Sequence, residues 1–426
     1  MPTALRHVVH LLRRSGFGGP AGEVGHLTGL DLPSVVDQIL GAAAPPIEAG
    51  PRLMDVPYGM WGAAMTVQNW WIARMVNSQS PIHERIALFW HGHFVSAIDK
   101  VDDPAAMWAQ HLNLRRYGLG RFSDLASAVT TDAALLRYLD NTSNRLDAIN
   151  ENFARELLEL MTMGVGTYRQ ADVVAAAHAW TGHGVGADGR YQFHPDAHDF
   201  SPFTFLGSTR TWNGPEILDE VVNGAGRPAT ARHVATRLWS FLAYPNPEPT
   251  LVASLGAAFM AADLDITALL RAIFLRPEFY SDRARYGLLR TPVDFVVAAL
   301  RSTGVTLDEV HLEWNIEKTG QCLLLPPNVG GWPQNEGWIS ASTFNGRAQL
   351  ASMIATLAAR HGVLADAATG AVAGMADRAM ATFGITEPSP VTIAGVQAWL
   401  AAEPPGPLRP TRLMALIMLT PDFQLA

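Results

Sequence analysis

Apolar residues recur at a helical spacing along most of the chain. The pattern is clearest over residues 35–39, 61–75 and 238–242, where apolar positions fall three or four residues apart. Alternation of apolar and polar residues, which would indicate half-buried strands, is scarce. The sequence therefore predicts an all-α fold: a large orthogonal bundle of many helices, with long functional loops and little or no β-sheet.

Helix-start signals occur at several of the predicted element boundaries. Pro81 and Pro292 each follow a Ser or Thr, which places proline in the first helical turn, where its missing N–H is not needed. Thr306 and Glu309 have the spacing of a capping box. These signals support the helical interpretation.

Stretches rich in proline and glycine interrupt the helical pattern. They fall near residues 42–58, 184–230, 318–342 and 403–411, and the second is too long for a plain connection. Long loops in a helical protein often carry function. We expect a single domain over residues 1–426 with four parts: a helical core at 1–183, a long loop at 184–230, a second helical part at 231–345 and C-terminal helices at 346–426.

Composition excludes several classes of protein. Of the 426 residues, 48% are hydrophobic and 16% are charged, as is typical of a globular protein with a sizeable core. The formal charge of −8 is not gathered into a block of one sign, so we expect no nucleic-acid partner. No window approaches the roughly 18 uninterrupted apolar residues of a membrane span. The Arg pair at 13–14 is followed by glycine-rich sequence, so we predict no export signal and a soluble, cytoplasmic protein without a membrane partner.

Standard active-site patterns are missing from the sequence. Cys322 is the only cysteine, which excludes an intrachain disulfide and any cysteine-based metal cluster. His83-Glu84 begins a zinc-protease pattern, but Ala87 stands where the second histidine would be needed. The sequence also has neither a GxSxG elbow nor a GxxxxGK phosphate loop. A metal would therefore need His, Asp, Glu or Asn ligands.

Two histidines interrupt an unusually apolar helical segment. Residues 80–98 are apolar on nearly every helical face, so this helix should be buried. His91 and His93 point almost oppositely at 100° per residue, and they share one site only if Gly92 permits a kink. Either histidine could bind a metal or transfer protons. The alternative is that each satisfies a hydrogen bond in the core.

A second polar group flanks the apolar stripe of residues 150–160. Asn152, Glu156 and Glu159 fall together at helical spacing beside that stripe. Carboxylates next to a core are costly unless they are paired or bind a metal. A structural salt bridge to an arginine elsewhere is the alternative. Glu151 and Arg155 lie four residues apart on the opposite face and are predicted to form an exposed ion pair.

Histidines also gather in the third segment of interest. His178, His183, His194 and His198 fall within 21 residues, and Asp199 follows directly. Clustered imidazoles suit a transition metal or proton transfer, although histidine-bearing surface loops are also common. We retain His198 and Asp199 as the preferred pair.

These segments, in this order, resemble a known bacterial family. The resemblance covers essentially the whole chain and rests on these motifs: HLLRRSGFG at 10–18, PIHERIALFWHGHFVSA at 81–97, LLRYLDN at 135–141 with NENFARELLEL following, YRQADV at 168–173, HDFSPFTFLG at 198–207, LLLPPNVGGWPQNEGWIS at 323–340 and LTPDFQ at 419–424. The family is domain of unknown function 1800. The resemblance implies little about activity; many members look exported, and some accompany a protein resembling the alkaline-phosphatase superfamily, which is therefore a possible partner.

The resemblance also marks individual positions of this sequence. The family's pattern falls on these residues: His91, His93, Asn150, Asn152, Arg155, Glu156, Glu159, His198, Asp199 and Trp332. Two departures are Phe203, where relatives tend to have a basic residue, and HAWTGH at 178–183, where relatives tend to have an Arg-aromatic-Thr-Gly-Trp run. These departures predict a substrate different from that of exported relatives.

We therefore predict a metal-dependent enzyme with a centre of histidines and carboxylates. His91, His93, Glu156 and Glu159 would bind iron, copper, manganese or zinc in a helical core. His198 and Asp199, with Glu159, would complete the site or move protons. The other candidates are Asn150, Asn152, Arg155, His178, His183 and Trp332. Oxidation or reduction of a small organic or peptidic substrate is favoured over hydrolysis because the surroundings are rich in Trp, Phe and Met.

The alternative from another class is a binding or scaffold protein without catalysis. In that case the motifs are buried polar networks, and residues 326–338, with Trp332 and Trp338, form a rigid interaction loop. Convergence of the motif regions around one enclosed cavity would favour the enzyme. Pairing of the carboxylates with arginines, without a cavity, would favour the scaffold.

Overall fold

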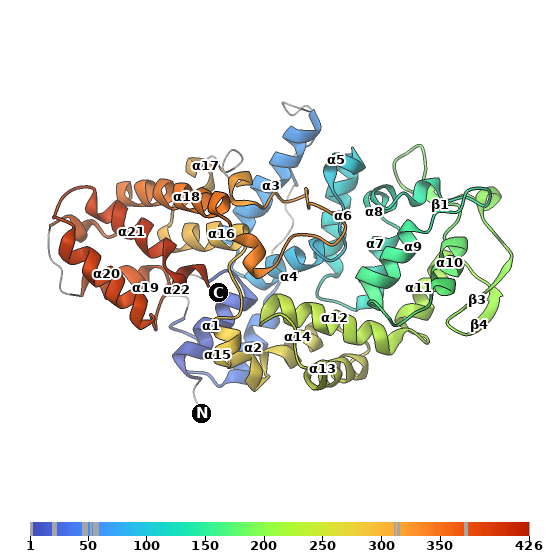
Figure 1. The fold of residues 1–426 in the computed structure, drawn as a ribbon, viewed down its shortest axis with the longest axis horizontal. Coiled ribbons are helices and arrows are strands. Elements are labelled where there is room, and N and C mark those ends of the chain that lie inside the picture. Colours follow the sequence, from blue (N-terminus) through green and yellow to red (C-terminus); the bar gives the residue numbers. More distant parts are fainter. Residues whose placement is uncertain are drawn as a thin grey trace.

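The computed structural model describes residues 3–18, 24–44, 50–51, 53, 59–310, 312, 316–369 and 374–425. The molecule is elongated, with helices α19 to α22 at one end and the small β-hairpins at the other (Figure 1). The fold is predominantly α-helical, as the periodicity predicts. Among the described residues, no helix is long and apolar enough to cross a membrane.

The helices of the first part of the chain lead up to the first hairpin. Their bounds are α1 Leu5–Ser15, α2 Leu32–Leu40, α3 Gly59–Asn77, α4 Pro81–His91, α5 Ile98–Val101, α6 Pro104–Tyr117, α7 Phe122–Thr130, α8 Ala133–Tyr138, the 3-10 turn η2 Asn141–Ser143, α9 Asn152–Glu156, the π-helix η3 Leu157–Thr162 and α10 Gln170–Ala179.

The remaining helices follow the hairpins. Their bounds are α11 Gly214–Val222, α12 Arg227–Leu242, α13 Pro249–Ala261, α14 Ile266–Phe274, α15 Asp282–Arg285, α16 Pro292–Thr303, α17 Leu307–Val310, α18 Ala341–Arg360, α19 Met375–Thr382, α20 Pro390–Ala402, α21 Arg409–Leu419 and α22 Pro421–Gln424. The short 3-10 turn η4 Pro195–Ala197 lies between the two hairpins. Further 3-10 turns lie between the later helices: η5 Pro277–Tyr280, η7 Glu317–Thr319, η8 Asn335–Trp338 and η9 Ala365–Thr369.

Cap chemistry explains several of these helix starts. At α16, Thr291 and Asp294 exchange hydrogen bonds in a capping box, with Pro292 in the first turn. At α17, the Thr306 backbone N–H donates to Glu309 Oε2 over 2.9 Å. Both starts agree with the sequence signals.

The segment expected as a long loop at 184–230 contains regular structure. Antiparallel strands β1 His183–Val185 and β2 Tyr191–Phe193 pair with His183 opposite Phe193. Strands β3 Pro202–Phe205 and β4 Ser208–Thr211 form a second hairpin, and α11 follows. Strands of three or four residues are too short to produce a readable alternation, so the sequence pattern did not predict them.

Two hydrophobic clusters share α4. One cluster draws on residues from α1 to α15 and includes Ile86 and Phe89 of α4. The other combines α16 to α22 with part of α3 and includes Ala87 and Leu88 of α4. Because opposite faces of α4 serve different clusters, this helix is buried on all sides, as its sequence predicts.

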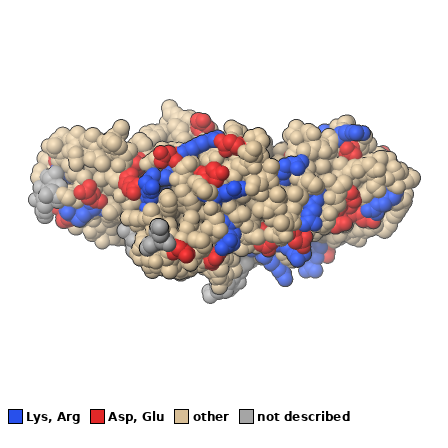
Figure 2. All heavy atoms as spheres, turned by 90° about the horizontal axis from the view of Figure 1, so that it is seen from below, with Lys and Arg blue, Asp and Glu red and all other residues tan. Residues whose placement is uncertain are grey.

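Charged side chains on the outside are mixed. Figure 2 shows Lys and Arg interspersed with Asp and Glu over the drawn face, with no extended patch of one sign. Several arginines instead lie inside the molecule, including Arg14, Arg85, Arg290 and Arg347. Buried arginines are rare unless they have partners or a ligand.

Candidate functional site

His91 lies at the last position of α4 and makes a hydrogen bond to the backbone of a distant segment. The Leu324 N–H donates to His91 Nε2 over 3.0 Å, so this nitrogen carries no proton. The ring packs against Trp71 and Trp332, with centroid separations of 5.4 and 5.1 Å. Burial lowers the pKa of His91 to about 4, which keeps the imidazole neutral at physiological pH.

His93 faces a different part of the core. Its Nε2 donates to Met161 O over 2.9 Å, and His233 Nε2 donates to Leu160 O over 2.8 Å. Both carbonyls belong to the π-helix η3, whose wider turn changes which backbone groups find partners within the helix. The two imidazoles therefore cap the end of η3. Burial, reinforced by the cationic Arg237, lowers the pKa of His93 well below its ordinary value.

The carboxylates of the α9–η3 segment are Glu156 and Glu159, and neither forms a hydrogen bond with His91 or His93. Burial and the neighbouring Glu159 raise the pKa of Glu156. Glu159 accepts a hydrogen bond of 3.1 Å from Tyr168 Oη, and burial together with this bond raises the pKa of Tyr168 to about 12. Glu151 and Arg155 form the exposed ion pair that their spacing predicts, at 2.7 Å.

The two asparagines of this motif hold the backbone. Asn150 Oδ1 accepts from the Asn152 N–H over 2.9 Å, and Asn152 Nδ2 donates to Leu139 O over 3.1 Å. Asn144 Oδ1 in turn accepts from the Asn150 N–H. These bonds fix the turn that leads into α9.

The third predicted group does come together, at the end of α10. His178 Nδ1 lies 2.7 Å from Asp199 Oδ2, and Thr181 Oγ1 accepts from the Asp199 N–H over 2.8 Å. Burial acts to raise the pKa of Asp199, but hydrogen bonds from Ser201 and His178 outweigh it and lower that pKa. His198 Nδ1 donates to Thr181 O over 2.8 Å.

His183 adds an imidazole to this group. Its Nδ1 lies 2.8 Å from Tyr191 Oη, and its ring lies 6.0 Å from that of His198. Burial, with a smaller effect of His198, lowers the pKa of His183 to about 3. The imidazoles of this segment thus bond mainly to backbone and hydroxyl groups, and His178 alone bonds to a carboxylate.

The predicted ligands do not gather into one centre. Within the part of the chain that the structure describes, no three His, Cys, Asp or Glu side chains lie together as metal ligands would. His91, His93 and the pair His178 and Asp199 each have separate partners. His91 and His93 contact different elements, because α4 ends at His91 and the two rings point toward Leu324 and η3.

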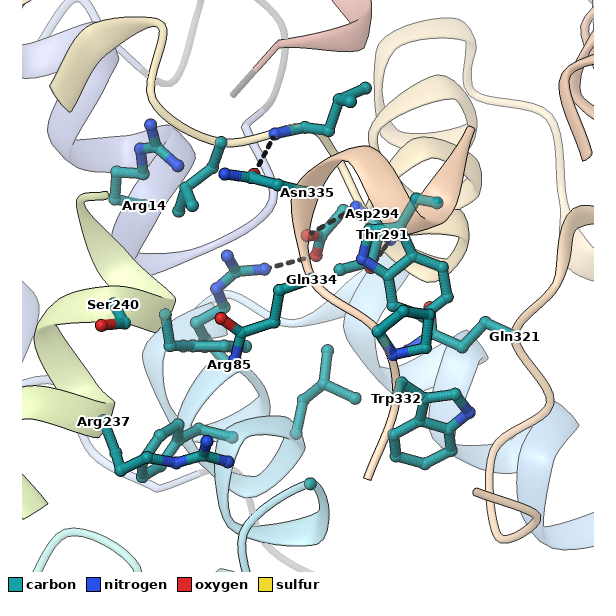
Figure 3. Close-up of a pocket in the computed structure, with 18 of the residues that line it drawn as sticks. Arg14, Arg85, Arg237, Ser240, Thr291, Asp294, Gln321, Trp332, Gln334 and Asn335 are labelled. Carbon is teal, nitrogen blue, oxygen red and sulfur yellow. Dashed lines mark hydrogen bonds and ion pairs between the residues drawn. The ribbon is translucent and has the colours of Figure 1, made fainter. Parts of the chain in front are cut away.

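A cavity forms instead at the junction of the two hydrophobic clusters (Figure 3). It holds about 820 Å³ of space free of protein atoms, its open mouth included. The residues that carry polar or aromatic groups into its lining are Arg14, Arg85, Phe89, Arg237, Ser240, Phe241, Thr291, Asp294, Gln321, Trp332, Gln334, Asn335 and Trp338. Three of the sequence motifs, at 10–18, 81–97 and 323–340, thus meet around one cavity.

Arg14 is fully buried at one side of this cavity. Its Nη2 donates to Ala284 O over 2.5 Å, while its Nε and Nη1 have no hydrogen-bond partner among the described residues. Burial, together with the nearby Arg85, lowers the pKa of Arg14 well below its ordinary value. An arginine nevertheless stays protonated in proteins, so Arg14 presents a charge with spare donors.

Arg85 projects from α4 and pairs with the one carboxylate of the lining. Its Nη1 contacts Asp294 Oδ1, and its guanidinium lies 4.5 Å from the ring centre of Phe241. The Nε of Arg85 has no partner among the described residues. Asp294 also accepts a backbone hydrogen bond in the capping box of α16, so its negative charge already interacts with the start of that helix and with Arg85.

Arg237 is the third cation of the lining and projects from α12 (Figure 3). Burial lowers its pKa. Its side chain is half-buried, and no described residue forms a hydrogen bond or an ion pair with its guanidinium. Arg237, like Arg14, therefore lines the cavity without an ion-pair partner among the described residues.

The facing wall comes from the segment before α18. Trp332 lies on the side of the cavity opposite the three arginines (Figure 3). Gly331 has φ +85°, and a Cβ there would lie 2.8 Å from Gly92 O, so only glycine lets this segment pass the end of α4. Asn335 holds the segment to the chain before α16, because its Oδ1 accepts from the Leu289 N–H and its Nδ2 donates to Gly287 O.

Sequence reasoning found only part of this site. Trp332 was a candidate, but Arg14, Arg85 and Arg237 were not singled out. For Arg85 a signal existed, because it stands in a helix predicted to be buried, where a lone cation needs a partner. Arg237 carries no local signal, because its position on α12 resembles any helix flank.

Comparison with known proteins identifies the family of this chain but no individual relative. No curated protein and no solved structure matches the chain. The sequence matches the family described as "Protein of unknown function (DUF1800)" over residues 10–425, nearly its whole length. The chain therefore belongs to the DUF1800 family.

Proposed function

We propose that this protein binds an anionic organic molecule in the cavity lined by Arg14, Arg85 and Arg237. The observation that carries the proposal is that three guanidinium groups face one cavity whose lining holds a single carboxylate, Asp294. Concave, mainly apolar cavities with a few polar groups in their lining are typical of small-molecule sites.

Energetics favour an anion over a neutral ligand. Removing an uncompensated charge from water is costly, so a buried cation without a partner destabilises the fold unless a ligand completes it. Guanidinium groups bind carboxylates and phosphates with paired, charge-assisted hydrogen bonds. Arg14 is fully buried and has donors without a partner, and the half-buried Arg237 has no hydrogen-bond or ion-pair partner among the described residues.

The proposal names a ligand and no reaction, at a place that the sequence did not indicate. The motifs at 10–18, 81–97 and 323–340 meet there, whereas those that carry Glu156 and Asp199 do not. The metal-dependent enzyme, with a divalent transition metal and an oxidoreductase or hydrolase activity, stays a prediction. The separate partners of His91, His93 and Glu159 give it less support than the arginine cavity gives to anion binding.

Thermal unfolding tests the proposal. Sulfate and benzoate are compared with chloride at equal ionic strength, for the natural chain, Arg237→Gln and the matched control Arg232→Gln. Arg232 is an exposed residue of the same helix, α12, so the control removes the same charge outside the cavity. We expect sulfate or benzoate to raise Tm in the natural chain and in Arg232→Gln, and much less in Arg237→Gln. Equal shifts in all three proteins, or no shift beyond that of chloride, would overturn the proposal, since sulfate also stabilises proteins non-specifically.

A further inference from the structure

We infer that the ligand carries a dianionic tetrahedral group, as in a phosphate monoester, with its organic part against Trp332. This inference rests on the proposed function and specifies the class of ligand. It follows from the charges of the lining, from the donors left unused and from the division of the cavity into a cationic and an aromatic side.

The charges of the cavity lining favour a ligand with two negative charges over a monoanion. The ionisable groups of the lining are the cations Arg14, Arg85 and Arg237 and the carboxylate Asp294. Asp294 pairs with Arg85, so two positive charges are left without compensation. A carboxylate or sulfate ester would neutralise one of them, whereas a dianion neutralises both.

The unused donors fit a group with three terminal oxygens. Arg14 Nε and Nη1 and Arg85 Nε are buried without partners, and the guanidinium of Arg237 has none among the described residues. These groups come from α1, α4 and α12 and approach the cavity from different directions (Figure 3). A planar carboxylate reaches donors in one plane, while a tetrahedral phosphate can accept from several directions.

The opposite side of the cavity suits an organic group. Trp332 faces the arginines across it, and Leu288 and Pro333 also line it. Aromatic and aliphatic side chains add contact area and shape without charge. The anionic end and the organic part of one molecule would thus contact different walls.

Among the described residues, no imidazole lines the cavity, and burial favours the neutral form of those nearby. Burial lowers the pKa of His10, which lies near Arg14, and those of His93 and His233, which lie near Arg237. A phosphate monoester changes from monoanion to dianion near pH 6. A pH dependence of affinity would then report the charge of the ligand.

Calorimetric titration of the full-length chain tests this inference with phenyl phosphate, phenyl sulfate and inorganic sulfate at about pH 5 and about pH 7.5. At the higher pH, we expect phenyl phosphate to bind about tenfold more tightly than phenyl sulfate, an isostere that is always a monoanion. The affinity of phenyl phosphate should fall about tenfold at the lower pH, where about a tenth of this ligand remains dianionic. Inorganic sulfate, a dianion at both pH values, should bind with unchanged affinity and so shows that the cavity is intact.

The outcomes separate this inference from the proposed function. If phenyl sulfate binds as tightly as phenyl phosphate, the inference of a dianionic ligand is wrong, whereas the proposal of anion binding is supported. If none of the three binds, both are wrong.

Paired tryptophan variants test where the organic part lies. Trp332→Ala should weaken phenyl phosphate several-fold and leave inorganic sulfate unchanged, while Trp61→Ala, at an exposed tryptophan of α3, should change neither. If Trp332→Ala weakens neither ligand, or both equally, the organic part does not lie against Trp332.

Discussion

Acidification should destabilise this protein through His91, and the structure gives the size of the effect. The side chain is only 2% exposed, and its Nε2 must be unprotonated to accept the Leu324 N–H. Burial lowers the pKa of His91 from an ordinary 6.5 to about 4. Protonation would remove this hydrogen bond and leave a charge in the core.

The direction and size of the change in unfolding free energy follow from the pKa values of His91 in the unfolded and the folded chain. Between pH 6.5 and about pH 4 the unfolded chain binds the proton and the folded chain does not. The contribution of His91 is therefore fully present above pH 6.5 and is lost as the pH falls toward 4. The difference between the two pKa values of His91 corresponds to about 3 kcal/mol of unfolding free energy, a large part of the roughly 5–15 kcal/mol that stabilises a typical protein.

Urea unfolding followed by circular dichroism measures this dependence. His91→Gln is the informative variant, because the Gln oxygen can accept from the Leu324 N–H but does not titrate. Near pH 5.5, the unfolding free energy of the natural chain should fall about 1 kcal/mol per pH unit more steeply than that of His91→Gln. His26→Gln, which removes an exposed imidazole, is the control and should keep the natural slope. Equal slopes for the natural chain and His91→Gln would refute the reasoning.

Three further predictions concern the cavity and the predicted metal. Asp294→Asn should lower the unfolding free energy by about 3–5 kcal/mol, measured by urea titration, because it leaves the buried cation of Arg85 unpaired. Gly331→Ala should lower Tm and change the tryptophan fluorescence, because the new Cβ would contact the carbonyl oxygen of Gly92 at the end of α4. Elemental analysis of the natural chain, His91→Gln and Glu156→Gln tests the predicted metal centre, which requires that both variants lose a transition metal bound by the natural chain.

Matched variants decide each of these outcomes. Asp282→Asn removes a carboxylate that is 90% exposed and should change stability by no more than about 0.5 kcal/mol. If it destabilises as much as Asp294→Asn, the buried ion pair is not the cause. Gly189→Ala introduces the same left-handed strain as Gly331→Ala without a steric contact, so a similar effect would contradict the role of close approach. A stoichiometric metal lost in both His91→Gln and Glu156→Gln would favour the metal centre.

The sequence by itself determined the local features of this protein. The helical class, the burial of α4, the capping bond of Thr306 with Glu309 and the ion pair of Glu151 with Arg155 all agree with the structure. Each depends on residues within a few positions of one another. Their spacing alone sets which side chains share a helical face or reach a free backbone N–H.

Only the tertiary structure decided which polar groups meet. His91 and His93 stand two residues apart, yet the end of α4 sends one ring toward Leu324 and the other toward η3. Arg14, Arg237 and Trp332, far apart along the chain, line one cavity. Such meetings depend on how helices pack across two hydrophobic clusters, and neither periodicity nor spacing within one helix carries that information.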